Sequence, residues 1–323
     1  MIPIRDQIPS KSYPAVTHGI IGLNVLVFLY QTMQGENIER FIYTYGLVPA
    51  RYAVPDISAH FTFVEQAFAL LSFMFLHGGV LHLLGNMWSL YIFGDNVEDR
   101  MGTTRFLVFY LLCGWASGFA HLWSNWGSTV PTIGASGAIA GVMGAYFILF
   151  PGARIITLIP IFFIPYFVEI PAVVFLGIWL LFQFFYASLP GPEGGGGIAW
   201  WAHIGGFVFG MIAVKLFSRL PESHLDEKLH ETLARHSTPR LQRLQPVSES
   251  DDLDLHGTVT ITAKEARNGT RKMISVPGDA AKRAFMVTIA PGTENGTRIR
   301  LAGLGRAESG RAGDIYLEIR VEG

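Results

Sequence analysis

Long apolar segments with almost no charge dominate the N-terminal part of this sequence. Residues 17–217 are nearly stripped of charged side chains, whereas residues 218–323 have the composition of an ordinary soluble protein. Over all 323 residues only 15% are charged, against about 25% in an average soluble domain. This split predicts an all-α polytopic membrane domain followed by a small soluble domain.

Six apolar segments are candidates for transmembrane helices, each of which needs about 17–25 residues. The fourth covers only about 22 Å of a hydrocarbon core about 30 Å thick. Its N-terminal end therefore stops below the membrane surface, where non-helical backbone must line a water-filled cavity or be covered by protein. Short helices are expected at 37–45 and 58–71, and a re-entrant or interfacial link at 159–167. The six segments are residues 17–33, 76–93, 106–123, 136–150, 166–189 and 198–217.

Basic residues orient these helices. With the N-terminus inside, the cytoplasmic segments carry seven of them and the outside loops carry only Arg40 and Arg51, as the positive-inside rule requires. Both termini are then cytoplasmic, and we expect a multi-pass protein of the bacterial inner membrane without a removable signal peptide. The net charge of −1 gives no indication of a nucleic-acid partner. The seven are Arg5, Lys11, Arg100, Arg105, Arg154, Lys215 and Arg219.

Polar side chains occur at a few positions inside the apolar segments. Ser136 begins the fourth segment and His203 lies in the sixth. In the second, His82 and Asn86 are four residues apart and therefore share one helical face. Polar and ionisable residues at membrane depth are costly and indicate a functional site by default. The single cysteine, Cys113, excludes both an internal disulfide and a cysteine-based zinc site.

Rows of small residues predict which helices touch, because close helix contact in membranes needs Gly, Ala or Ser at the interface. One row is Ser136, Ala140 and Gly144, and another is Gly206 and Gly210 after His203. We therefore expect the fourth and sixth helices to approach closely enough for the Ser136 hydroxyl to reach the His203 ring.

A serine hydroxyl needs an adjacent base to become a nucleophile. Ser136 and His203 supply that pair, and no acidic residue is well placed to orient His203, which favours a catalytic dyad with the base held by packing. Attack on an amide also creates an oxyanion, which preorganised donors must stabilise. The backbone N–H of Ser136 and the side chains of His82 and Asn86 are the predicted donors.

At these residues the chain resembles the rhomboid intramembrane serine proteases over about residues 15–217. The resemblance lies in His82-x-x-x-Asn86, Gly134-Ala135-Ser136-Gly137 and Ala202-His203-Ile204-Gly205-Gly206, and residues 97–102 are similar to the family's polar loop after the second span. It implies that Ser136 is the nucleophile, that His203 is the base, and that His82, Asn86 and the Ser136 amide form the oxyanion hole. It also implies cleavage of transmembrane protein substrates in or near their membrane segments, without a cofactor or metal. Some members have an aromatic residue near the base at the position of Ala140.

Three other interpretations remain open. An inert rhomboid-like protein could bind client helices without cutting them, although such relatives typically lose the serine or histidine. Six spans would also suit a transporter, but no inverted repeat or acidic coupling residue is evident. A zinc site formed by His77, His82 and His203 lacks the Glu-containing helix motif of zinc proteases. His77 itself is expected in a loop near the mouth of the cavity.

The C-terminal part changes character. Residues 221–235 predict a short amphipathic helix and 237–256 a flexible linker. From residue 257 on, short apolar runs separated by Asn-Gly and Pro-Gly turns predict an all-β domain. Residues 264–270, 291–301 and 312–316 resemble the peptide-binding β-domain of DnaJ-type co-chaperones, which implies a peptide or protein ligand bound at a sheet edge. The predicted domains are therefore 1–218, 219–256 and 257–323.

Overall fold

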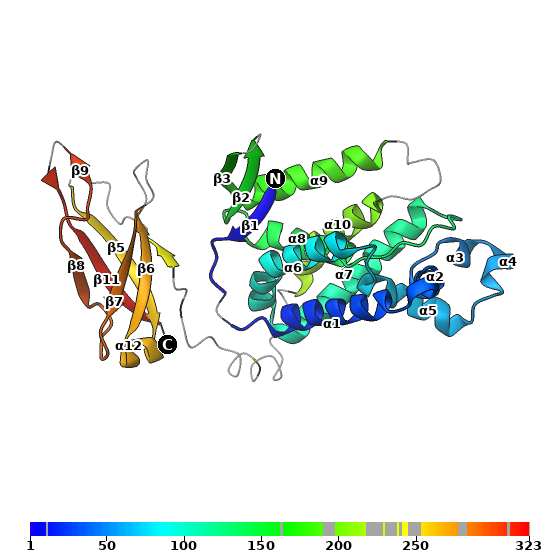
Figure 1. Cartoon of the computed structure of the whole chain (residues 1–323), viewed down its shortest axis with the longest axis horizontal. Helices are drawn as coiled ribbons and strands as arrows, with labels where there is room; N and C mark the ends of the chain where they lie inside the picture. Colours follow the sequence, from blue (N-terminus) through cyan, green and yellow to red (C-terminus); the bar gives the residue numbers. More distant parts are fainter. Residues whose placement is uncertain are drawn as a thin grey trace. The chain divides into compact units, whose positions relative to one another are not determined.

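Each of the predicted apolar segments contains a helix in the computed structural model of this chain (Figure 1). The structure describes residues 1–323 except 11, 162–163, 190–197, 218–228, 230–237, 239–240, 245–252, 277–282, 309–310 and 323. The chain divides into two units, Met1–Leu233 and Ala234–Gly323. The long helices of the first unit are α1 (Ala15–Thr32), α6 (Val80–Met101), α7 (Thr103–Ser124), α8 (Ser136–Leu149), α9 (Ala172–Ala187) and α10 (Trp200–Phe217).

Length and apolarity qualify three of the described helices, α1, α7 and α10, as membrane spans. A fourth candidate is the broken pair formed by residues 63–75 and α6, which is bent by 79°. The helices α8 and α9 are apolar but shorter. The described residues therefore contain three or four candidate spans by these criteria, fewer than the six that the sequence predicts.

The segment between α1 and α6 contains the short helices that the sequence predicts. The second expected helix begins later than predicted, at Phe63, because Thr62 and Glu65 form a reciprocal capping box there. His77, which follows this segment, is fully buried rather than at a cavity mouth, and its backbone N–H and C=O both bond the Gln31 side chain. The helices here are η1 (Gly35–Asn37), α2 (Ile38–Tyr45), α3 (Ala50–Ala53), α4 (Pro55–Ser58), α5 (Phe63–Ser72) and η2 (Phe73–Phe75).

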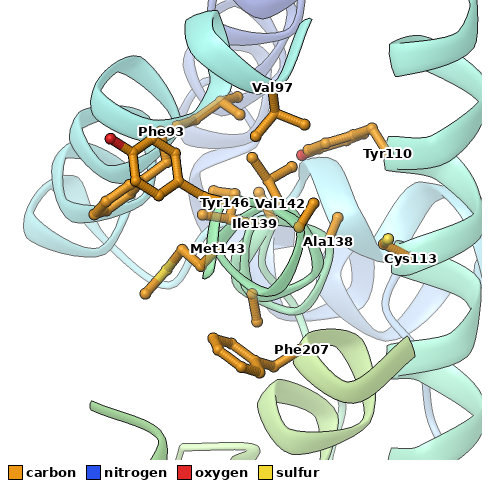
Figure 2. Close-up of a cluster of buried hydrophobic side chains, with 14 of the residues drawn as sticks. Phe93, Val97, Tyr110, Cys113, Ala138, Ile139, Val142, Met143, Tyr146 and Phe207 are labelled. Atoms are coloured by element: carbon orange, nitrogen blue, oxygen red, sulfur yellow. The ribbon is translucent and has the colours of Figure 1, made fainter. Parts of the chain in front are cut away.

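The helix α8 lies at the centre of the first unit and packs on α6, α7, α9 and α10. Every residue from Gly137 to Tyr146 is buried. Figure 2 shows Ala138, Ile139 and Val142 surrounded by apolar side chains of the neighbouring helices. On the side facing α10, glycines allow backbone contact, since a Cβ on Gly144 would lie 2.2 Å from the carbonyl oxygen of Phe207. This packing fixes the start of α8 relative to α10.

The described residues of the stretch 159–167, expected as a re-entrant or interfacial link, lie in two strands of a three-stranded antiparallel sheet. Its strands β1 (Ile2–Asp6), β2 (Arg154–Ile161) and β3 (Ile164–Pro171) pair in the order β1-β2-β3. The fifth helix consequently begins at Ala172 and not at Tyr166, because Pro171 would lie in the interior of a helix that began at Tyr166. Residues 97–102, expected as a loop, continue α6 to Met101, and Gly102 with φ of 92° separates α6 from α7.

Two three-stranded sheets share one hydrophobic core in the second unit. One has the order β5-β11-β8 and the other β4-β6-β7, and the alternating burial of β5 and β11 places Val259, Ile261 and Leu317 in the core. The strands are β4 (Leu241–Arg243), β5 (Leu255–Thr262), β6 (Thr270–Val276), β7 (Arg283–Ile289), β8 (Arg298–Leu301), β9 (Ala307–Glu308), β10 (Arg311–Ala312) and β11 (Ile315–Glu322).

Two expectations for the C-terminal part are wrong in detail. The β-domain also contains a short helix, α12 (Ala263–Asn268), which a capping box of Thr262 and Glu265 starts. The stretch expected to be a flexible linker contributes β4, which pairs parallel to β6, and the first residues of β5. The amphipathic helix predicted at 221–235 lies, apart from one residue, outside the described residues.

Candidate active site

Ser136 is the first residue of α8, and the residues before it hold it near His82 of α6. Gly134 has φ of 133°, a conformation that side chains rarely adopt. A Cβ at Gly134 would lie 2.9 Å from both Cε1 and Nε2 of His82 and 3.7 Å from Ser136 Oγ. Glycine is therefore required at this position for both its backbone conformation and its contact with His82. Ser136 is partly exposed, unlike the buried residues that follow it in α8.

Ser136 and His203 meet as the small-residue rows predict. His203 Nε2 lies 2.7 Å from Ser136 Oγ. The approach depends on backbone contact between α8 and α10, since a Cβ on Gly206 would lie 2.0 Å from the Gly137 carbonyl oxygen. His203 is 9% exposed, whereas the serine beside it remains more accessible. A serine hydroxyl beside a histidine ring nitrogen is the arrangement that nucleophilic catalysis needs.

Packing alone does not hold His203, contrary to the sequence-based expectation. Its Nδ1 lies 2.8 Å from Oε1 of Gln183, a buried residue of α9. The Trp179 ring, one turn earlier on α9, lies 6.0 Å from the imidazole centroid, and the Trp200 ring contacts the imidazole edge-on at 6.2 Å. Sequence reasoning missed Gln183, although it is the one amide side chain in an otherwise apolar helix.

His82 and Asn86 lie on α6 as predicted, one turn apart. His82 Nδ1 accepts a hydrogen bond of 3.2 Å from the Gly78 N–H, which leaves Nε2 as the protonated nitrogen of the neutral ring. Asn86 is 8% exposed, and its Nδ2 has no hydrogen-bond partner in the described structure. An unpartnered buried donor is costly and calls for a functional explanation.

Among the described residues, no three His, Cys, Asp or Glu side chains gather in a way that could hold a metal ion. The rings of His77 and His82 contact each other at 5.1 Å between centroids. His203 faces Ser136 and Gln183 through its two ring nitrogens.

Comparison with known proteins finds two family models that match this chain. Residues 64–220 match the family model described as the rhomboid domain. The first unit contains a rhomboid domain. Residues 255–323 match the DnaJ C terminal domain, so the rhomboid domain is followed by a DnaJ-like β-domain.

Several named proteins are similar to this chain. Rhomboid protein 1, mitochondrial, of Saccharomyces cerevisiae is 27% identical over 230 residues, which are 68% of this chain and 58% of the yeast protein. Rhomboid protease GluP of Bacillus subtilis is 32% identical over 132 residues, 41% of this chain and 24% of GluP. RHOMBOID-like protein 2 of Arabidopsis thaliana is 40% identical over 78 residues, 24% of each chain. The chain thus spans 58% or less of the length of these relatives.

The polar end of α6 ties the rhomboid helices to the N-terminal segment. Glu98 accepts hydrogen bonds from the backbone N–H groups of Val16 and Thr17 and from the Thr17 hydroxyl. Asp99 accepts from the backbone and the hydroxyl of Ser12. The Glu98 bonds satisfy backbone N–H groups in the first turn of α1, which would otherwise lack partners. They hold α1 against α6, the helix that carries His82 and Asn86.

Proposed function

We propose that this protein is an intramembrane serine endopeptidase that hydrolyses peptide bonds in or near the transmembrane segments of membrane proteins. The observation that carries the proposal is the distance of 2.7 Å between Ser136 Oγ and His203 Nε2. The rhomboid family match and the relative named as a protease support it. The reaction uses only side-chain and backbone groups and needs no cofactor.

In the proposed reaction the Ser136 hydroxyl attacks the carbonyl carbon of the scissile bond while its proton passes to His203 Nε2. The carbonyl oxygen becomes an oxyanion, which the Ser136 N–H, the Asn86 amide and His82 stabilise. The protonated His203 then donates its proton to the leaving amine, and an acyl ester on Ser136 remains. Water, deprotonated by the same imidazole, hydrolyses this ester and regenerates the serine.

Labelling with a fluorophosphonate tests this function, because the reagent reacts with an activated serine. We expect the full-length protein to be labelled and the Ser136→Ala variant to remain unlabelled. Mass spectrometry of a cleaved single-span client should place the cut in or near its membrane segment. A wild-type protein that neither labels nor cuts any client would instead support an inert rhomboid-like protein that binds client helices.

We further propose that α1, α6, α7, α8, α9 and α10 all cross a membrane, with both termini in the cytoplasm of a bacterial cell. The excess of basic residues in the segments on one side supports this orientation. In this topology Ser136 opens toward the outer face. The domain limits 1–218, 219–256 and 257–323 belong to the same proposal. Labelling single engineered cysteines in residues 35–75 with an impermeant reagent in intact cells tests the topology, and protection of these sites would reject it.

We propose that the DnaJ-like β-domain binds an extended peptide, such as a tail of a substrate or partner, along the edge strand β7. Two observations support this. Among the described residues β7 pairs only with β6, and Met273 and Met286, opposite each other on these strands, are 38% and 53% exposed. A protein truncated after Arg219 should cleave clients with altered rate or selectivity. Unchanged rates and client choice would reject the proposal.

A further inference from the structure

We propose that Gln183 is a positioning residue that fixes the tautomer and the orientation of the His203 imidazole. This inference rests on the proposed protease function, since it assigns the residue that supports the base. Its starting point is the hydrogen bond of 2.8 Å between Gln183 Oε1 and His203 Nδ1, which joins α9 to α10 inside the membrane unit. Gln183 is 5% exposed and therefore has no solvent to compete for its amide.

The bonds of Gln183 determine which way its amide points. Its Nε2 donates to the Trp179 carbonyl oxygen at 3.3 Å, and a carbonyl oxygen can only accept. The Oε1 end therefore faces His203, and because this oxygen can only accept, Nδ1 must carry the ring proton. In the neutral imidazole Nε2 is then unprotonated, which is the form that accepts the Ser136 proton. The Gln183 amide thus selects the tautomer that nucleophilic attack requires.

A neutral acceptor suits this location. A carboxylate would also accept from Nδ1, but an isolated ionised carboxylate at membrane depth carries a large desolvation cost. The described residues place no acidic side chain in hydrogen-bond contact with His203. A glutamine supplies the directional acceptor without a charge. Ser136, His203 and Gln183, from three different helices, thus form a chain of two hydrogen bonds among uncharged side chains.

The helix that carries Gln183 also restrains the imidazole ring plane. The Trp179 ring lies against His203 with an interplanar angle of 33° and stacks on Phe207 at 5.8 Å. One turn of α9 thus provides both the hydrogen-bond acceptor for Nδ1 and an aromatic ring beside the imidazole. Ala140 of α8 is not aromatic. In this chain the aromatic rings beside the His203 imidazole are therefore Trp179 of α9 and Trp200 of α10.

The test compares Gln183→Met, which keeps the length of the side chain and removes the acceptor, with Gln183→Glu, which keeps an acceptor at the same reach. Phe182→Met is the matched control, because it introduces the same residue at an exposed neighbouring position of α9. We expect Gln183→Met to lower kcat and the fluorophosphonate labelling rate together by about 10- to 100-fold, with KM unchanged. Gln183→Glu should keep both rates within about threefold of the wild type, because a carboxylate also accepts from Nδ1 and its hydrogen bond to the ring offsets part of its desolvation cost. Phe182→Met should behave as the wild type.

A second measurement reads the tautomer directly and needs no activity. In protein with ¹⁵N-labelled histidine, the His203 signals, assigned by comparison with His203→Gln, should show a proton on Nδ1 in the wild type. In Gln183→Met that preference should be lost. The proposal is overturned if Gln183→Met keeps the wild-type tautomer and labelling rate, if it changes KM alone, or if Gln183→Glu fails as badly while remaining folded. A wild type without Ser136-dependent labelling would end the protease proposal, whereas the tautomer signals would still decide the role of Gln183.

Discussion

Gly206 of α10 lies so close to Gly137 of α8 that a Cβ on Gly206 would come within 2.0 Å of the Gly137 carbonyl oxygen. No side chain can relieve that contact by rotating, because both partners are backbone. The same relationship recurs one turn later, where a Cβ on Gly210 would lie 2.0 Å from the carbonyl oxygen of Gly141. The Ser136–His203 distance is thus set by two backbones in contact.

Gly206→Ala should therefore push α10 away from α8 and separate the base from the serine. We expect a destabilisation of about 1–3 kcal/mol or more, as overpacking of a close interface gives, together with a large loss of labelling. Gly177→Ala on α9 is the control, since a Cβ there meets nothing within 4 Å. Melting temperatures and labelling rates in detergent measure both effects, and similar behaviour of the two variants would contradict this account of the packing.

Ser136→Ala and His203→Ala should each abolish cleavage, with kcat lower by about 10⁴-fold or more, since nucleophile and base act as one unit. The double variant should lose little beyond either single variant for the same reason. Ser136→Ala should melt close to the wild type. His203→Ala should remain folded but melt at a lower temperature, because it leaves the buried Oε1 of Gln183 without its partner. Ser89→Ala is the control, as its hydroxyl donates to the Gly85 carbonyl oxygen within α6. Residual cleavage in Ser136→Ala would mean that another group is the nucleophile.

Asn86→Ala should lower kcat by about 10²–10³-fold, the usual effect of removing one oxyanion donor. Its stability cost should be small, because Asn86 Nδ2 has no partner to lose in the described structure. Asn24→Ala provides the contrast: Asn24 is also buried, but its Nδ2 donates to the Ile20 carbonyl oxygen at 2.8 Å. We expect Asn24→Ala to lower the melting temperature and to leave kcat of the folded fraction unchanged. The reverse pattern would remove Asn86 from the oxyanion hole.

Much of this site could be predicted from the sequence, for identifiable physical reasons. The cost of charge in a membrane marks the apolar helices, and the small residues around Ser136 and Gly206 require a close helix contact. The support from Gln183 could not be predicted, because it depends on the rotation of α9 relative to α10. A single glutamine among apolar residues fixes no such rotation.

The sheet of β1, β2 and β3 was missed for a different reason. Strands β2 and β3 are mostly apolar and each contains proline, so they have neither the alternation of a half-exposed strand nor the length of a span. Strand β1 has five residues, and it is held by pairing with β2, more than a hundred residues away in the sequence. Such a long-range pairing leaves no local signal.

Asp6→Asn should stabilise the protein near neutral pH. The Asp6 carboxylate accepts hydrogen bonds from Tyr146 Oη at 2.6 Å and Asn96 Nδ2 at 2.7 Å, yet burial raises the pKa of Asp6 from 3.8 to about 6. The folded state then binds a proton more readily than the unfolded state, so stability falls as pH rises from about 4 to about 6. We expect a higher melting temperature for Asp6→Asn than for the wild type at pH 7.5, and no difference below pH 4. Asp56→Asn, at an exposed position, should show neither effect.

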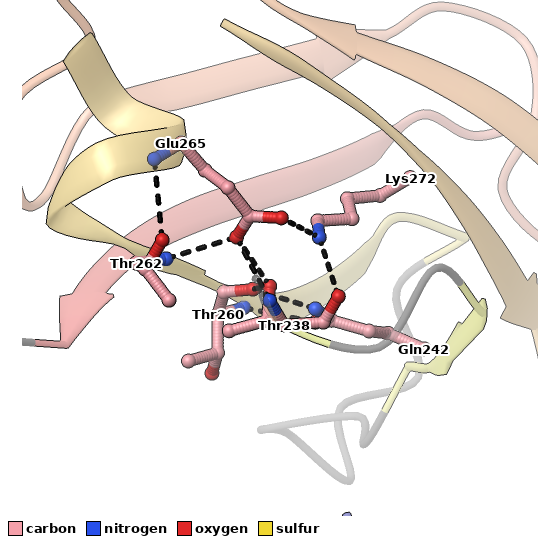
Figure 3. A network of polar contacts seen from close by, with 6 residues as sticks. All are labelled: Thr238, Gln242, Thr260, Thr262, Glu265 and Lys272. Atoms are coloured by element: carbon pink, nitrogen blue, oxygen red, sulfur yellow. Dashed lines mark hydrogen bonds and ion pairs between the residues drawn. The ribbon is translucent and has the colours of Figure 1, made fainter. Parts of the chain in front are cut away.

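Lys272→Met should destabilise the β-domain by about 3–5 kcal/mol, the usual cost of removing one partner of a buried ion pair. Lys272 is 1% exposed, and its ammonium donates to Glu265 and to the Thr238 carbonyl oxygen (Figure 3). Without it, the Glu265 carboxylate stays buried and loses its only cation in the described network.

Adding Glu265→Gln should recover part of the lost stability, because the uncompensated charge is then gone while Thr238 and Thr262 keep an acceptor. Lys264→Met, at an exposed position of α12, is the control. Limited proteolysis of the full-length chain measures the stability of this domain, and equal protection in the two Lys→Met variants would show that the pair contributes nothing to it.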